Sequence, residues 1–142
     1  MKKRNKKWWH NKCWRLWSLY RRLKASNHEG YCRCITCGKF HNYKEMNLGH
    51  LRHGVLDFDE INTNPQCVYC NQYQSGQRDL YYIWAVKTHG QKAVDDMYIR
   101  ASMAMKGGNY SVEYLQLLFD ELTQKLEVLN ANRIQPHEGR EE

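Results

Sequence analysis

The segments Cys34-Ile35-Thr36-Cys37 and Cys67-Val68-Tyr69-Cys70 form two C-x-x-C pairs with 29 residues between them. Two such pairs can complete a tetrahedral site of four thiolates around one zinc ion. A four-thiolate site has no open position, so this pattern predicts a structural zinc rather than a catalytic one. A simple zinc ribbon has about 15–20 residues between its pairs. The longer interval therefore leaves room for a two-stranded insertion.

Three polar residues occur in a fixed order: His50, then Asn62, then Asn71 directly after Cys70. This order resembles the HNH nuclease motif, in which the third residue is His or Asn, and the resemblance implies hydrolysis of phosphodiester bonds. Phosphodiester hydrolysis needs a base to activate water and a cation on the phosphate. His50 is the candidate general base, because neutral imidazole suits that task near pH 7. Asn71 is the candidate ligand of a catalytic Mg²⁺ or Mn²⁺, since hard divalent ions prefer oxygen and keep several waters. We expect Asn62 to hold the loop between strand and helix so that His50 is aimed correctly.

One position of this chain departs from the HNH motif. Many HNH enzymes place an acidic or histidine metal ligand directly before the base, where this chain has Gly49. The resemblance is therefore to ββα-metal (His-Me finger) branches in which a lone Asn supplies the ligand. Asn47, Gln74 and Ser75 remain open as helpers, and Arg52 is the candidate phosphate contact near the base.

The positive charge of the chain is concentrated at its start. The formal net charge is +7 and the sequence pI about 9.1, and no acidic residue precedes Glu29. Such an excess attracts polyanions, so DNA is the expected partner. A merely soluble basic protein is the alternative. The residues of the arm expected to contact DNA are Lys2, Lys3, Arg4, Lys6 and Lys7.

A chain of 142 residues suits one domain with modest extensions. Its basic start runs into Trp8-Trp9-His10 instead of an apolar segment, and no apolar run of about 18 residues follows. We therefore expect no secretory signal, no contact with membranes and a cytoplasmic location, in the host cell if a phage encodes the chain. In that compartment C-x-x-C pairs predict zinc rather than disulfides.

The segments on both sides of the cysteine region show apolar residues at helical spacing. A helix over residues 7–25 is expected to carry an apolar stripe of Trp9, Cys13, Leu16, Trp17, Tyr20 and Leu23. We interpret its aromatic residues as core anchors, with stacking on bases as the alternative. Further helices are expected over 79–88, over 91–105 and from Ser111 onward. The apolar positions of the first are Leu80, Ile83, Trp84 and Val86, and those of the last include Leu115, Leu118, Leu122, Leu126 and Leu129. This leucine stripe fits either an intramolecular core or a dimer seam.

The organisation follows from these elements. A basic, Trp-rich arm and helix are expected at 1–30, a zinc-stapled HNH-like core at 31–90, a helical region at 91–135 and a disordered tail at 136–142. Within the core, strands are expected near 46–51 and 55–58, and a helix near 68–71. The fold class is α+β, with a small ββα-metal core on a four-cysteine zinc frame and flanking α-helices.

A narrower resemblance rests on shared motifs between residues 31 and 97. These are Cys34-Ile35-Thr36-Cys37-Gly38, Gly49-His50, Asn62, Gln66-Cys67, Cys70-Asn71, Ser75-Gly76 and Gly90-Gln91-Lys92-Ala93-Val94-Asp95. They are similar to the phage lambda NinG (Rap) family. That resemblance implies a phage recombination endonuclease acting on branched DNA such as D-loops, Holliday junctions and flaps. It also implies phage or host recombination proteins as partners, and a homodimer is the simplest assembly for paired cuts at a junction.

The expected function is divalent-metal-dependent hydrolysis of phosphodiester bonds in branched DNA. Two alternatives stay open. One is a non-catalytic zinc module that binds DNA in recombination, which the glycine at position 49 favours. The other is a less selective phage HNH nuclease.

Overall fold

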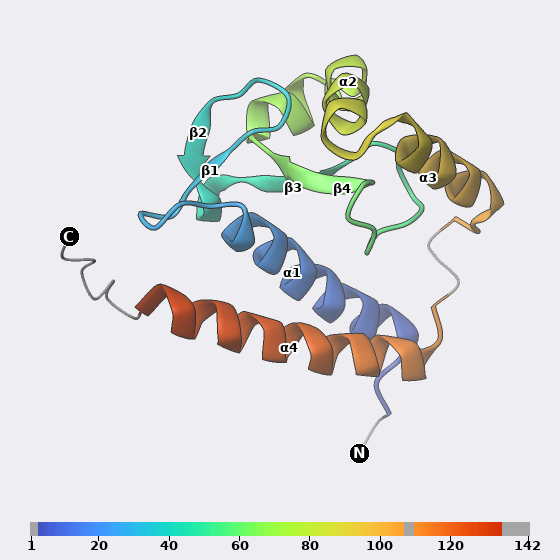
Figure 1. The fold of residues 1–142 in the computed structure, drawn as a ribbon. Helices are drawn as coiled ribbons and strands as arrows, with labels where there is room; N and C mark the ends of the chain where they lie inside the picture. The colour runs from blue at the N-terminus through green and yellow to red at the C-terminus, as the bar shows by residue number, and fades with distance from the viewer. Residues whose placement is uncertain (1–2, 107–109, 135–142) are drawn as a thin grey trace.

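Residues 3–106 and 110–134 are described by a computed structural model (Figure 1). Lys2, the expected break at 107–109 and the expected tail at 136–142 lie outside these residues. The helices are α1 (Lys6–Lys24), α2 (Arg78–His89), α3 (Gln91–Met103) and α4 (Val112–Ile134). The strands are β1 (Tyr31–Arg33), β2 (Phe40–Asn42), β3 (Asn47–His50) and β4 (Thr63–Gln66), with short helical turns η1 (Tyr43–Glu45) and η2 (Tyr69–Tyr73). The mixed α and β character agrees with the sequence prediction.

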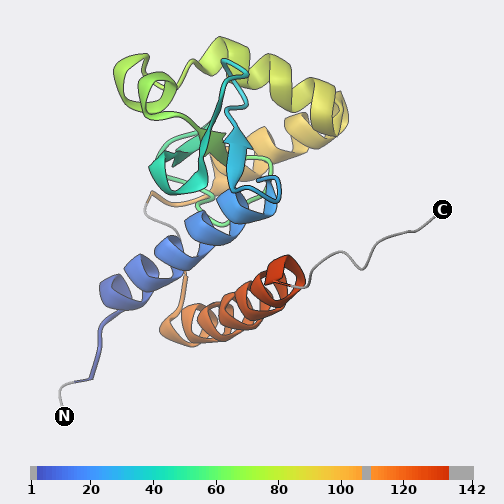
Figure 2. The ribbon, with the colours of Figure 1, turned by 90° about the vertical axis from the view of Figure 1, so that its left-hand side faces the viewer.

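Helices α1 and α4 lie side by side and run in the same direction (Figures 1 and 2). Each begins at a side-chain cap, because Asn5 Oδ1 accepts from the Trp8 N–H at 3.0 Å and Ser111 Oγ accepts from the Tyr114 N–H at 3.0 Å. The two apolar stripes then bury each other. Their buried residues are Cys13, Trp17, Leu115, Leu118 and Leu122, which share a core with Leu48 of β3.

The leucine stripe of α4 is thus an intramolecular core, and its use as a dimer seam is wrong. Two amphipathic helices in one chain cover each other without a concentration-dependent step. A homodimer would need another surface and stays a prediction. The interpretation of the N-terminal aromatic residues as core anchors is confirmed for Trp17, which is 5% exposed.

The central strands pair as two antiparallel hairpins, β1 with β2 and β3 with β4. Asn47 of β3 lies opposite Gln66, and His50 lies opposite Thr63. The strand predicted at 55–58 is wrong. That segment is a loop, because Gly54 and Leu56 have positive φ values of 78° and 49° and the Asn62 side chain bonds to its backbone.

Helices α2 and α3 cover the opposite side of the β3–β4 hairpin from α1 (Figure 1). Their core residues are Tyr81, Ala85, Val94, Met97 and Ala101, packed with Leu51 and Val55 of the loop. The apolar face predicted for α2 is partly wrong, since Leu80 and Ile83 are 46% and 49% exposed. The helix instead turns Tyr81 inward, where its hydroxyl donates to the Gly49 carbonyl at 2.9 Å. None of the described helices has both the length and the apolar composition to cross a bilayer.

The intramolecular α1–α4 core predicts a sharp contrast between two leucines of α4. Leu122 is 1% exposed and Leu117 is 71% exposed. Loss of a buried leucine costs about 2–5 kcal/mol, and Leu122→Asp also buries a carboxylate, so this variant should be largely unfolded. Leu117→Asp should change the free energy of unfolding by less than about 0.5 kcal/mol. Urea denaturation followed by circular dichroism measures both, and equal losses would contradict the packing of α4 on α1.

Candidate metal centre and catalytic site

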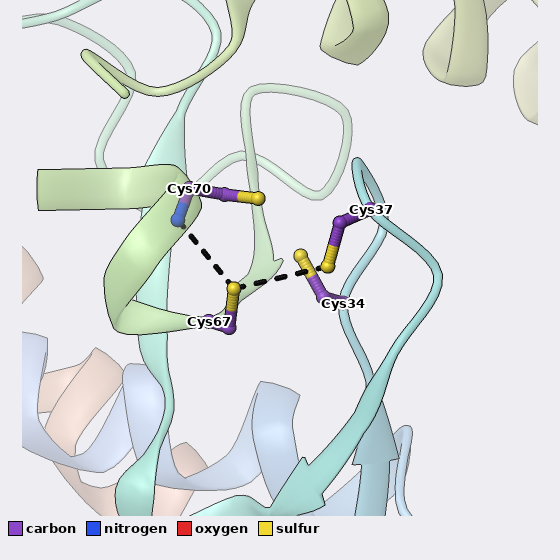
Figure 3. Close-up of side chains that lie close together, drawn as sticks. All are labelled: Cys34, Cys37, Cys67 and Cys70. Carbon is purple, nitrogen blue, oxygen red and sulfur yellow. Dashed lines mark hydrogen bonds between the residues drawn. The ribbon is translucent and has the colours of Figure 1, made fainter. Parts of the chain in front are cut away.

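The four motif cysteines converge from two separate segments (Figure 3). Cys34 and Cys37 lie in the turn between β1 and β2, while Cys67 and Cys70 lie directly after β4 and on η2. Their sulfur atoms all lie within 4.8 Å of one another, with 3.9 Å between those of Cys37 and Cys67. A tetrahedral zinc with bonds of about 2.3 Å would hold its sulfurs about 3.8 Å apart. The four cysteines are therefore positioned to bind a metal ion, and the geometry fits a structural zinc.

His50, the candidate base, is the last residue of β3, and its side chain is 16% exposed. Its Nε2 lies 2.9 Å from Asp57 Oδ1, and the other oxygen of Asp57 lies 2.8 Å from Nε2 of His10 on α1. Trp14, also on α1, stacks on the imidazole with ring centroids 5.1 Å apart and 18° between the planes. Within the described residues, Nδ1 of His50 has no hydrogen-bond partner. One carboxylate and one indole thus hold the ring and leave one nitrogen available.

Sequence reasoning missed Asp57, His10 and Trp14. Asp57 falls within the segment that was interpreted as a strand, and its charge between Leu56 and Phe58 was the available signal. His10 and Trp14 are one helical turn apart on α1, a position that only the packing of α1 against the loop brings to His50.

Asn62 makes the contacts expected of a residue that fixes a loop. It is fully buried, its Oδ1 accepts from the Arg52 N–H at 2.7 Å, and its Nδ2 donates to the carbonyls of Val55 at 2.9 Å and Arg52 at 3.1 Å. The Leu51 N–H donates to the Asn62 carbonyl at 2.8 Å, directly after His50. That Asn62 also sets the orientation of the His50 side chain stays a prediction.

Asn71 lies on η2, and its Oδ1 faces Gly49. The oxygen is 3.0 Å from the position that a Cβ on residue 49 would take, and Gln66 Oε1 is 1.8 Å from the same position. Residues alternate between the two faces of a strand, so Gly49 faces η2 while His50 faces α1. The structure thus brings Asn71 to the residue next to His50. Among the proposed helpers, Gln74 instead donates to the Tyr69 hydroxyl at 2.9 Å.

The basic residues proposed to bind DNA lie on the surface. Lys3, Arg4, Lys6 and Lys7 are exposed, and the last two already belong to α1. Arg4 stacks over the Trp8 ring at 3.9 Å, and exposed Arg52 lies over the Tyr98 ring at 5.4 Å. These contacts fix the direction of two cationic side chains without neutralising them.

The family of the chain follows from its similarity to known proteins. The family described as Bacteriophage Lambda NinG protein matches residues 1–132. The chain belongs to the NinG family. It is 31% identical over 104 residues to Protein ninG of Escherichia phage lambda, covering 70% of this chain and 48% of that protein.

Two further relatives show similar partial coverage. Protein ninG of Salmonella phage P22 is 32% identical over 104 residues, or 70% of this chain and 49% of its own length. Protein ninG of Escherichia phage 933W is 38% identical over 68 residues, or 45% and 33% respectively. This NinG-family chain thus spans a third to a half of the length of these relatives. No solved structure matches it.

The cysteine thiols in this NinG-family chain differ in pKa. Burial alone would raise the pKa of the Cys34 thiol, but hydrogen bonds with the backbone at Cys37 and with Thr36 lower it to about 6. Burial raises the pKa of Cys70 to about 12. Four neighbouring thiolates repel one another, so full ionisation of the cluster requires a bound cation. Burial raises the pKa of both other cysteines, Cys13 and Cys32, to about 11, which is typical of inert thiols.

The cluster predicts one tightly bound zinc per chain and a loss of structure without it. Cys67→Ser should abolish stoichiometric zinc and much of the helical signal, because metal binding and folding are coupled in such frames. The matched control is Cys13→Ser, a buried thiol outside the cluster, which should retain zinc. Elemental analysis and circular dichroism measure both. A folded wild-type chain without zinc would refute the prediction.

Asp57 is electrostatically linked to both histidines. Burial would raise the pKa of its carboxyl, but hydrogen bonding and charge from His50 and then His10 outweigh burial and lower it. A pKa below that of the unfolded chain means that the ionised carboxylate stabilises the fold. This contribution is present above about pH 4 and is lost as the pH falls through the lower folded pKa.

Asp57→Asn should therefore make the free energy of unfolding less dependent on pH in the acid range. We expect the wild type to lose more free energy of unfolding than the variant as the pH falls from about 5 to 2. Asp96→Asn is the control, because Asp96 is 53% exposed and pairs with Lys92 on the same helix. Urea denaturation at a series of pH values measures the difference. Parallel curves for wild type and Asp57→Asn would show that the two histidine contacts add no stability.

Proposed function

We propose that this chain is a divalent-metal-dependent DNA endonuclease of the HNH (ββα-metal) type. The hairpin β3–β4 and the turn η2 would provide its two strands and helix. The observation that carries the proposal is the contact between His50 and Asp57. A partly exposed imidazole with one nitrogen bound to a carboxylate and the other free is arranged as a general base.

The proposed chemistry assigns a task to each residue. Asp57 accepts from Nε2–H of His50, so Nδ1 is the atom that takes a proton from the attacking water. Trp14 stacks on the ring and limits its rotation. Asn62 fixes the loop that carries Asp57 by bonding to its backbone. The Asp57 carboxylate orients the His50 ring through its hydrogen bond with Nε2.

Asn71 is the proposed protein ligand of a catalytic Mg²⁺ or Mn²⁺. Its Oδ1 fits a hard divalent ion, which prefers oxygen and retains water. Such an ion would place positive charge on the phosphate and stabilise the leaving 3′ oxygen. The side chain of Asn71 holds this position from η2, which the neighbouring Cys70 ties to the cysteine cluster.

The proposed substrate is DNA, and branched DNA in particular. The net charge of +7 and the exposed residues Lys3, Arg4, Lys6, Lys7 and Arg52 support binding to phosphates. The preference for D-loops, Holliday junctions or flaps rests on the NinG family alone. So do the phage or host recombination proteins as partners. Action in the host cytoplasm is proposed as well. A homodimer making paired cuts would use a surface other than the α1–α4 core.

A zinc module that binds DNA without cutting it is the second candidate. Gly49 favours it, because no side chain at that position can reach a metal. Labelled linear, flap and four-way DNA, incubated with and without Mn²⁺, separates the two candidates. Equal cleavage of all three DNAs would instead favour a less selective HNH nuclease.

His50→Ala should abolish Mn²⁺-dependent cleavage and leave DNA affinity within a few-fold of wild type. Loss of a general base lowers the rate by about 10²–10⁴-fold and has little effect on ground-state binding. His53→Ala is the matched control, an exposed histidine whose ring lies 5.8 Å from that of His50. Asn71→Ala should reduce cleavage and be partly rescued by high Mn²⁺. Wild-type cleavage by His50→Ala would overturn the assignment of the base.

A further inference from the structure

The side chain of Gln66 is fully buried and only half satisfied. Its Nε2 donates to the Gly76 carbonyl at 2.8 Å and lies 3.1 Å from Thr36 Oγ1. The Gly76 carbonyl can only accept, which fixes the orientation of the amide. Its Oε1 has no hydrogen-bond partner within the described residues. A buried carbonyl oxygen without a partner is costly, so its position requires an explanation.

That oxygen occupies the space that a side chain on residue 49 would fill. A Cβ there would lie 1.8 Å from Gln66 Oε1 and 2.8 Å from the amide carbon. Any residue except glycine at position 49 would displace the amide. Asn71 Oδ1 lies 3.0 Å from the same position. Two amide oxygens from different elements, β4 and η2, therefore converge beside Gly49.

We propose that Gln66 Oε1 is a second protein ligand of the divalent cation, together with Asn71 Oδ1. It would take the place of the ligand that Gly49 cannot supply. This inference rests on the proposed function, since that function requires the cation. Two neutral oxygens are suitable ligands for Mg²⁺ or Mn²⁺, which keep most of their waters. They add no negative charge, so affinity without DNA is weak and rises when a phosphate joins the site.

The cysteine cluster determines which way this ligand points. Thr36 Oγ1 lies 3.3 Å from Cys34 Sγ. A zinc-bound thiolate can only accept, so the Thr36 hydroxyl donates to sulfur and its oxygen accepts from Gln66 Nε2. The zinc frame thus turns Oε1 away from itself and toward Asn71. The structural zinc and the divalent site are connected through two side chains.

The test measures Mn²⁺ binding to the zinc-loaded full chain in the absence of DNA. Electron paramagnetic resonance of free Mn²⁺ gives the dissociation constant over the millimolar range. We expect Gln66→Met and Asn71→Ala each to weaken binding at least about tenfold, as loss of a metal-site group does. Gly49→Ala should do the same, because it displaces Oε1 while Gln66 itself remains. Gln74→Met is the matched control, an exposed glutamine near η2, and should bind Mn²⁺ as the wild type does.

Zinc content and the thermal midpoint confirm that each variant is folded. If Gln66→Met loses zinc, its Mn²⁺ binding no longer tests the proposal. The Mn²⁺ affinity of Gly49→Ala, which keeps Gln66, is then the deciding measurement. Wild-type Mn²⁺ binding by Gly49→Ala and Gln66→Met would overturn the proposal and show that the two amides only pair with each other. Absence of Mn²⁺ binding to the wild type would also overturn it. The outcome is independent of cleavage, because a chain that binds Mn²⁺ through Gln66 but cuts no DNA would refute only the nuclease.

Discussion

The convergence of four sulfur atoms constrains most of the polar chemistry of this chain. It ties the turn between β1 and β2 to the end of β4 and to η2, across a long interval of sequence. The cluster also restricts the positions of the residues next to its cysteines. Gln66 directly precedes Cys67, and Asn71 directly follows Cys70. A metal ion at the sulfurs would thus fix the two amides that meet at Gly49, because a closed tetrahedral site leaves its ligands little freedom.

Helix α1 contributes to both stability and the candidate site. Its buried face packs on α4 through Cys13 and Trp17, which is the ordinary outcome of an amphipathic helix. The adjacent face carries His10 and Trp14 to Asp57 and His50. A change that shifts α1 on α4 therefore also shifts the groups around the imidazole. Fold stability and the geometry of the proposed base are coupled through one helix.

The parts that sequence predicted well are those with a simple physical signature. The C-x-x-C spacing located the four clustered cysteines that could bind a metal ion, and helical periodicity located α1, α3 and α4 within one or two residues. Strand β4 was missed because Thr63, Asn64 and Gln66 are polar and Pro65 cannot donate to a ladder. Apolar periodicity instead favoured the loop at 55–58, whose Val55 is buried without forming a strand. Asp57 was missed with it, since the partner of a histidine is set by loop conformation and not by spacing.

The polar strand β4 has a physical reason to lie at the centre of the fold. Buried polar side chains on it connect two helices: Thr63 accepts from Trp17 Nε1 of α1 at 2.9 Å, and Asn64 donates to the Tyr81 hydroxyl of α2 at 3.1 Å. Asn64 Oδ1 also accepts from Arg21 at 2.8 Å. Such a network adds little net stability, but any other packing would leave its members unpaired in a low dielectric. An apolar β4 could slide against α1 and α2, whereas this one holds both helices in a single register around His50 and Gly49.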